Sequence, residues 1–81
     1  MDFDWDEAKS EATFRARGFD FAYASRVFDG ARVVVLEEQV RSGEARTKVI
    51  GEVEANLLVI VFTMRAETCR IISARLASRK E

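Results

Sequence analysis

The side chains able to carry chemistry are restricted in this sequence of 81 residues, because it has no histidine and only one cysteine, Cys69. A single cysteine cannot form an internal disulfide, and without histidine it cannot build a zinc site. Acid–base and charge chemistry is therefore left to aspartate, glutamate, lysine, arginine and tyrosine. We expect neither a metal nor another cofactor.

Charged residues gather in two places where they could act together. Glu44 and Arg46 stand two residues apart in a predicted strand and so share one face, although such a pair is more often a surface ion pair that contributes about 0–1 kcal/mol. Residues 65–81 have a charge balance of +3 in a chain of net charge −1, from Glu67 and Glu81 against Arg65, Arg70, Arg75, Arg79 and Lys80. This basic end could contact phosphates; a solvated face or a surface for a protein partner are the alternatives.

Length and composition predict one small globular domain over residues 1–81. Hydrophobic residues make up 48% of the chain and charged residues 33%, which excludes a disordered protein. The apolar run 57–62 is too short to cross a bilayer, and no signal peptide opens the chain, so we expect a cytoplasmic protein. A domain of this size has a thin core, and with no disulfide or metal site a partner chain is the expected supplement.

The elements that would position the charged residues follow from hydrophobic periodicity and capping residues. Residues 1–5 can form a short edge strand, and Asp6 and Asp20 can cap helices over 7–17 and 20–28, the first ended by Gly18. Strands are expected at 32–37, 44–53, 57–63 and 68–74, with a polar loop over 38–43. A short third helix could begin at Arg75.

These elements predict an α+β fold, in which two N-terminal helices pack on one face of a four-stranded antiparallel meander. The opposite face of the sheet is then available to a ligand or partner, unless the C-terminal segment covers it.

Four segments of the chain, in order, resemble the BrnT family of toxins. The first two are Phe3-Asp4-Trp5-Asp6-Glu7-Ala8-Lys9 and Gly18-Phe19-Asp20-Phe21 with Ala24 and Val27-Phe28-Asp29 after it. Glu44, Arg46 and Gly51 fit a Glu-x-Arg strand with its glycine. The last and strongest match is the apolar strand 57–63 followed by Arg70-Ile71-Ile72-Ser73-Ala74-Arg75.

The resemblance implies a RelE/ParE-like fold and a metal-independent endoribonuclease that cuts RNA, inhibits translation and growth, and belongs to a type II toxin–antitoxin system. It also implies a BrnA-like antitoxin with a ribbon-helix-helix region. The toxin would dimerise through this antitoxin and would contact DNA only within that complex; no membrane is involved.

The chain departs from the family pattern in its first helix. The family usually has Asn where Thr13 stands, and Lys-His where Ala16 and Arg17 stand, so an imidazole at that site is excluded here.

RNA cleavage without a metal needs a base, cations on the phosphate and an acid for the leaving oxygen. Glu44 is the candidate base, and Lys9 or a water is the candidate acid. Arg46, Arg70 and Arg75 are candidates to hold the phosphate, with Arg65, Arg79 and Lys80 binding RNA around it. The alternative function is a non-catalytic toxin fold that binds an antitoxin and acts in operon autorepression; the missing histidine favours this alternative, and the retained arginines favour the enzyme.

Overall fold

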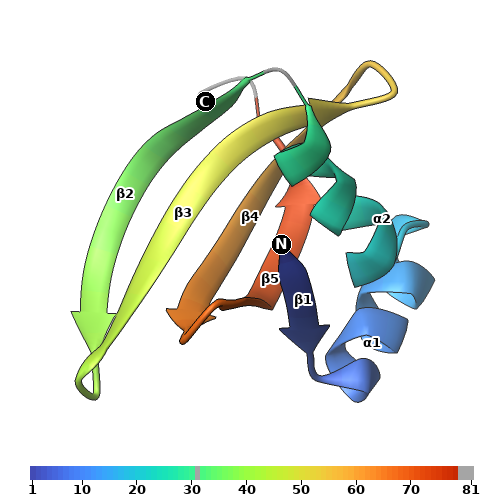
Figure 1. Cartoon of the computed structure of the whole chain (residues 1–81). Helices are drawn as coiled ribbons and strands as arrows, with labels where there is room; N and C mark the ends of the chain where they lie inside the picture. The colour runs from blue at the N-terminus through green and yellow to red at the C-terminus, as the bar shows by residue number, and fades with distance from the viewer. Residues whose placement is uncertain (31, 79–81) are drawn as a thin grey trace.

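A mixed five-stranded sheet with helices on one face forms the protein (Figure 1). The computed structural model describes residues 1–30 and 32–78. The strands are β1 (Asp2–Trp5), β2 (Val33–Arg41), β3 (Glu44–Val53), β4 (Asn56–Arg65) and β5 (Thr68–Leu76), in the spatial order β1-β5-β4-β3-β2. Strands β2 to β5 pair antiparallel in chain order, which confirms the predicted meander.

The predicted four-stranded sheet is incomplete, because β1 adds a fifth strand to it. This strand pairs with β5 in parallel, with Phe3 opposite Cys69 and Trp5 opposite Ile71. The residues 1–5 were expected as a short edge strand, but their partner lies more than sixty residues away in the sequence. No local pattern indicates that pairing, and the sheet is therefore mixed rather than antiparallel throughout.

The helices begin and end where the capping residues predict. Helix α1 (Glu7–Arg17) starts at Asp6, whose carboxylate accepts hydrogen bonds from the Ala8 and Lys9 amides, and ends at Gly18 with φ +86°. Asp20 caps α2 (Phe21–Ser25) through the Tyr23 amide. The predicted second helix then tightens into a 3₁₀ turn, η1 (Arg26–Asp29), instead of continuing as α-helix to residue 28.

The helical layer packs closely on the sheet at Gly51 in β3. A Cβ at this position would lie 2.4 Å from Cγ1 of Val27, so only glycine lets η1 approach the strand without a shift. The core lies between the layers and is built from side chains almost fully removed from solvent, among them Phe21, Val27, Val49, Leu58, Ile60 and Ile71.

Two tight hairpin turns connect β2 to β3 and β3 to β4, and the first explains why the end of β2 was predicted wrongly. Ser42 and Gly43 both have positive φ, as do Glu54 and Ala55, the pattern of tight two-residue hairpins. The expected loop over 38–43 is therefore mostly strand, and β2 extends to Arg41 with a bulge after Val35. Likewise, residues 75 and 76 continue β5 rather than starting a helix, and residues 79–81 of that expected helix lie outside the described residues.

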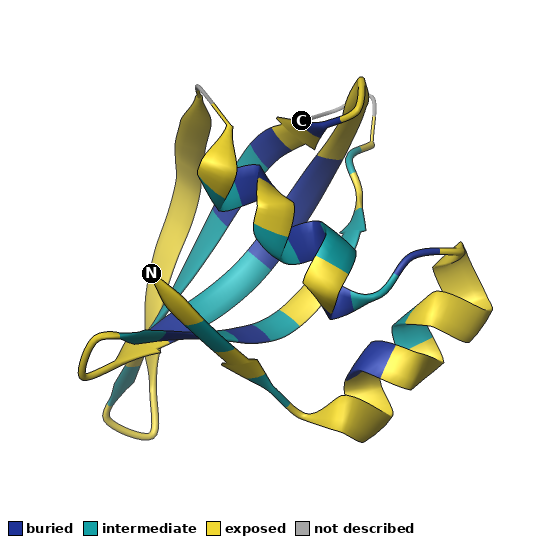
Figure 2. Ribbon diagram, turned by 45° about the vertical axis from the view of Figure 1, so that its right-hand side comes forward, coloured by how far each residue is buried: buried dark blue, intermediate teal, exposed yellow. Residues whose placement is uncertain are grey.

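Neither edge of the sheet is covered by a described strand, and the two edges differ. Strand β1 is four residues long, whereas β2 has nine residues that are all exposed, as Figure 2 shows. The apolar side chains in β2 include Val33, Val34, Val35 and Leu36. No helix in the described part of the chain is long and apolar enough to cross a membrane.

Candidate functional site

The charged residues singled out in the sequence lie mainly on the sheet face that the described helices leave uncovered, called here the open face. Strand alternation places Glu44, Arg46 and Lys48 of β3 on this face, because Val49 and Gly51, at the odd-numbered positions that follow, face the core. The pairing with β4 puts Arg65 and the β5 residues Arg70 and Arg75 on the open face too, because a bulge in β5 between Ile71 and Ser73 returns Arg75 to the face of Arg70. Three neighbouring strands thus bring together Glu44 and three arginines, Arg46, Arg65 and Arg70, at one end of the open face, whereas Arg75 lies further along β5.

Glu44 is paired with an arginine of the neighbouring strand, Arg65. Nε of Arg65 donates to Oε2 of Glu44 over 3.1 Å, from the end of the neighbouring strand β4. The Glu44 side chain is one-third exposed, so its carboxylate is partly accessible to solvent. Arg46, two residues further along β3, does not make this contact.

Arg70 is tied to the N-terminal strand. Its Nη1 donates to Oδ2 of Asp4 over 2.6 Å, directly across the parallel pairing of β1 and β5. Only about a quarter of the Arg70 side chain is exposed, so the ion pair both orients the guanidinium and neutralises part of its charge. A phosphate bound here would compete with, or bridge beside, the Asp4 carboxylate.

The remaining candidates are dispersed. Arg75 lies two strand positions beyond Ser73 and is half-buried, with Nη1 donating to the Leu76 carbonyl over 3.2 Å. Lys9 lies on α1, in the helical layer, and so is not grouped with the residues of the open face. Arg79 and Lys80 lie outside the described residues.

A hollow of about 150 Å³ on the open face was not recognised from the sequence. Strands β2 and β3 provide most of its wall, and the lining residues are Glu37, Gln39, Arg41, Arg46, Lys48 and Val61. Lys48 pairs with Glu37 over 3.6 Å, and Glu37 also accepts a hydrogen bond from Gln39. The alternation of Glu44, Arg46 and Lys48 was the signal available for Lys48. Gln39 and Arg41 fell in the segment wrongly predicted as a loop.

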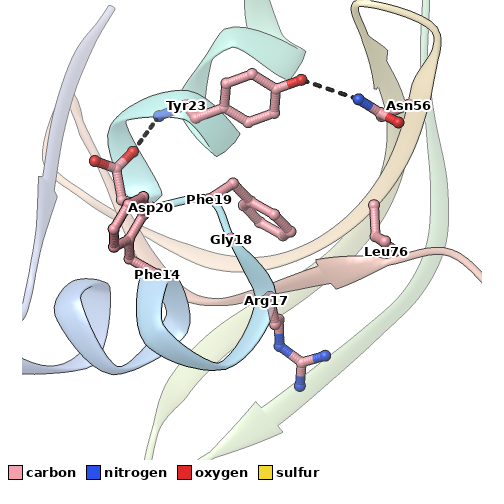
Figure 3. A pocket seen from close by; sticks show the side chains of 8 residues that line it. All are labelled: Phe14, Arg17, Gly18, Phe19, Asp20, Tyr23, Asn56 and Leu76. Atoms are coloured by element: carbon pink, nitrogen blue, oxygen red, sulfur yellow. Dashed lines mark hydrogen bonds between the residues drawn. The ribbon is translucent and has the colours of Figure 1, made fainter.

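A second hollow, of about 500 Å³, lies beside the helical layer, and Figure 3 shows the residues that line it. Its polar groups serve the fold: Asp20 caps α2, and the Tyr23 hydroxyl donates to the Val53 carbonyl while accepting from Asn56. Arg17 lies at the opposite end from Tyr23 and Asn56 (Figure 3). No carboxylate and cation converge here as they do on the open face.

The single cysteine is a core residue. Cys69 is fully buried, and burial raises the pKa of its thiol to about 11, so the nucleophilic thiolate is disfavoured. Among the described residues, no group of three His, Cys, Asp or Glu side chains is placed to hold a metal ion.

An α+β protein with a carboxylate and several guanidinium groups on one open sheet face is suited to bind a polyanion. Residues 5–81 match the family described as "Ribonuclease toxin, BrnT, of type II toxin-antitoxin system", and the chain belongs to this family. A comparison of the sequence with curated proteins found no match. The resemblance of the four segments is thereby confirmed over nearly the whole chain.

Proposed function

We propose that this protein is an endoribonuclease toxin that cleaves RNA without a metal ion, inhibits translation and growth, and acts in the cytoplasm. The observation that carries the proposal is the grouping of Glu44, Arg46, Arg65 and Arg70 on one open face from three strands. Family membership supports the class of activity. The grouping supports its location on the molecule.

In this proposal each of the charged residues has one role. Glu44, oriented by Arg65, takes the proton of the attacking 2′-hydroxyl. Arg46, Arg70 and Arg75 supply planar forks that bind phosphate oxygens and stabilise the charge of the transition state. Lys9 has no place in this set, because it belongs to the helical layer. Arg65, with Arg79 and Lys80, contributes positive charge for the flanking RNA.

The proposed partner is a BrnA-like ribbon-helix-helix antitoxin. Two features suit a partner chain: the charged open face and the exposed β2 edge, which presents valines and unpaired backbone groups. Covering the open face would exclude RNA without any distant conformational change. In this proposal the toxin dimerises through the antitoxin and reaches DNA only within the complex.

A non-catalytic module that binds an antitoxin and represses its operon is the second candidate. The ion pairs favour it, because Glu44 and Arg70 are both engaged within the protein itself, by Arg65 and Asp4. A purely structural face would have the same pairs.

Expression of the chain alone in bacteria separates the two candidates. An enzyme arrests growth with RNA decay, the antitoxin reverses the arrest, and the purified protein cuts RNA in the presence of a metal chelator. Harmless expression together with tight antitoxin binding would establish the second candidate. Cleavage that stops on chelation would contradict a metal-independent reaction.

A further inference from the structure

The hollow between β2 and β3 has the composition of an anion site. Three of its lining residues are cations, Arg41, Arg46 and Lys48, whereas Glu37 is its one acid. Strand register places all four on the open face, with Glu37 opposite Lys48. Glu37 is paired with Lys48 and accepts a hydrogen bond from Gln39. The charges of Arg41 and Arg46 are therefore not balanced by an acid that lines the hollow.

One polar atom in the hollow lacks a partner. The Nε–H of Arg46 is buried and has no hydrogen-bond acceptor within the described part of the chain. A buried donor left unsatisfied costs about 1–3 kcal/mol, and more when it belongs to a charged group. An oxyanion in the hollow would neutralise the guanidinium, and a small shift of the Arg46 side chain would let its Nε–H donate to that anion.

Lys48 can act as a proton donor, which the arginines of the open face do poorly. Guanidinium groups are poor proton donors because their pKa exceeds about 12, whereas a lysine ammonium can act as an acid. Of the two lysines within the described residues, Lys9 lies on α1 and Lys48 lines the hollow. The ion pair with Glu37, 3.6 Å long, holds Nζ of Lys48 at the wall beside Arg46.

We propose that this hollow binds the scissile phosphate of RNA and that Lys48 protonates the leaving 5′-oxygen; the inference rests on the proposed ribonuclease function. Glu44, Arg46 and Lys48 follow one another along one face of β3, with a spacing of about 7 Å per two residues. A phosphate held by Arg46 therefore lies between the base and the acid.

The step balances in protons and bonds. The 2′-oxygen attacks phosphorus and its proton passes to the Glu44 carboxylate. The P–O5′ bond then breaks, and O5′ takes a proton from Nζ of Lys48. The products are a 2′,3′-cyclic phosphate and a 5′-hydroxyl end, and water restores both side chains to their starting forms.

The test compares two RNA oligonucleotides that differ in one atom, cut at the site preferred by the wild-type protein. One has the natural bridging 5′-oxygen at that site, and the other has sulfur, which leaves as a thiolate without a proton. Lys48→Gln is expected to lose about 10²–10⁴-fold in rate on the oxygen substrate. On the sulfur substrate its loss should be less than tenfold, at unchanged melting temperature.

Three further variants make the result specific. Lys48→Arg keeps the charge without an easily lost proton, and it should stay slow on the oxygen substrate. Lys9→Gln should not show rescue by sulfur. Arg15→Gln, on the exposed surface of α1, should match the wild type on both substrates.

The possible outcomes distinguish failure of the role proposed for Lys48 from failure of the proposed ribonuclease function. Lys48→Gln at wild-type rate, full recovery in Lys48→Arg, or sulfur rescue in Lys9→Gln would overturn the role of Lys48 while leaving the ribonuclease intact. A wild-type protein that cuts no RNA would overturn the proposed function and this inference together.

Discussion

The two faces of the sheet differ in what they contribute, although each strand supplies both. On the helix-covered face, Leu58 and Ile60 have no exposed surface, and Phe21 and Val27 pack over the sheet. On the open face, the alternate residues of the same strands carry ion pairs and a guanidinium with an unsatisfied donor. One face therefore provides stability, and the other is free to hold charge that the core would not tolerate.

Because the two faces have different roles, the same substitution should cost very different amounts of stability at two adjacent residues of β4. Leu58→Ala should cost about 2–5 kcal/mol of the free energy of unfolding, because it leaves a cavity in the core. Leu57→Ala is the matched control, since Leu57 is 51% exposed on the open face, and should cost less than about 1 kcal/mol. Chemical denaturation of both variants measures the difference, and equal costs would contradict the separation of the faces.

On the open face, loss of the arginines should affect activity rather than folding. The double substitution Arg70→Ala and Arg75→Ala is expected to abolish toxicity and lower the cleavage rate about 10²–10³-fold, because phosphate charge in the transition state loses its donors. Asp4→Asn is the control, since it releases Arg70 from its ion pair without removing the guanidinium, and should keep activity. Full toxicity of the double variant at equal soluble expression would exclude a role for the two arginines in RNA binding or cleavage.

The close contact between Gly51 of β3 and Val27 of η1 can be tested by adding one methyl group. Gly51→Ala should destabilise the protein by about 1–3 kcal/mol, because the new methyl group meets Val27 at 2.4 Å. Adding Val27→Ala makes room, so the double variant should lose less than the sum of the two single losses. Thermal unfolding of the three variants gives the coupling, and strict additivity would mean that the contact does not limit the approach of η1.

The smallest effect concerns the neutral thiol in the core. Burial raises the pKa of Cys69 to about 11 from an ordinary value of 9.0. The unfolded chain therefore loses this proton before the folded chain does, and stability should fall as the pH rises from about 9 to about 11. Cys69→Ala should show a smaller fall over this range in denaturant unfolding at pH 8 and pH 11; an identical fall would mean that the thiol stays protonated in both states.

Local signals predicted the helical layer and the strand β3 well. Asp6, Gly18 and Asp20 mark helix boundaries by hydrogen bonds within a few residues, and alternation set the limits 44–53 correctly. The alternation of β2 failed for a physical reason: residues 37–41 are exposed on both faces, so their polar composition is typical of a loop.

The candidate site was predicted in part. Glu44 and Arg46 were found because they share a strand, and the register confirms that they share a face. The partners Arg65 and Asp4 could not be found, because the Glu44–Arg65 pair depends on how β3 and β4 align, and the Arg70–Asp4 pair joins residues 66 positions apart. The catalytic roles remain predictions.

The parallel pairing of β1 with β5 also sets an order of events during synthesis. Helix α1 and the β2–β3 hairpin need only near neighbours, but Asp4 cannot meet Arg70 until the next 66 residues, up to Arg70 itself, have been translated. At about 5–20 residues per second, that wait is roughly 3–13 s. During this time Asp4 and the rest of β1 have no β5 to pair with. The open face thus acquires its final arrangement of charges only when the last strand of the sheet has been made.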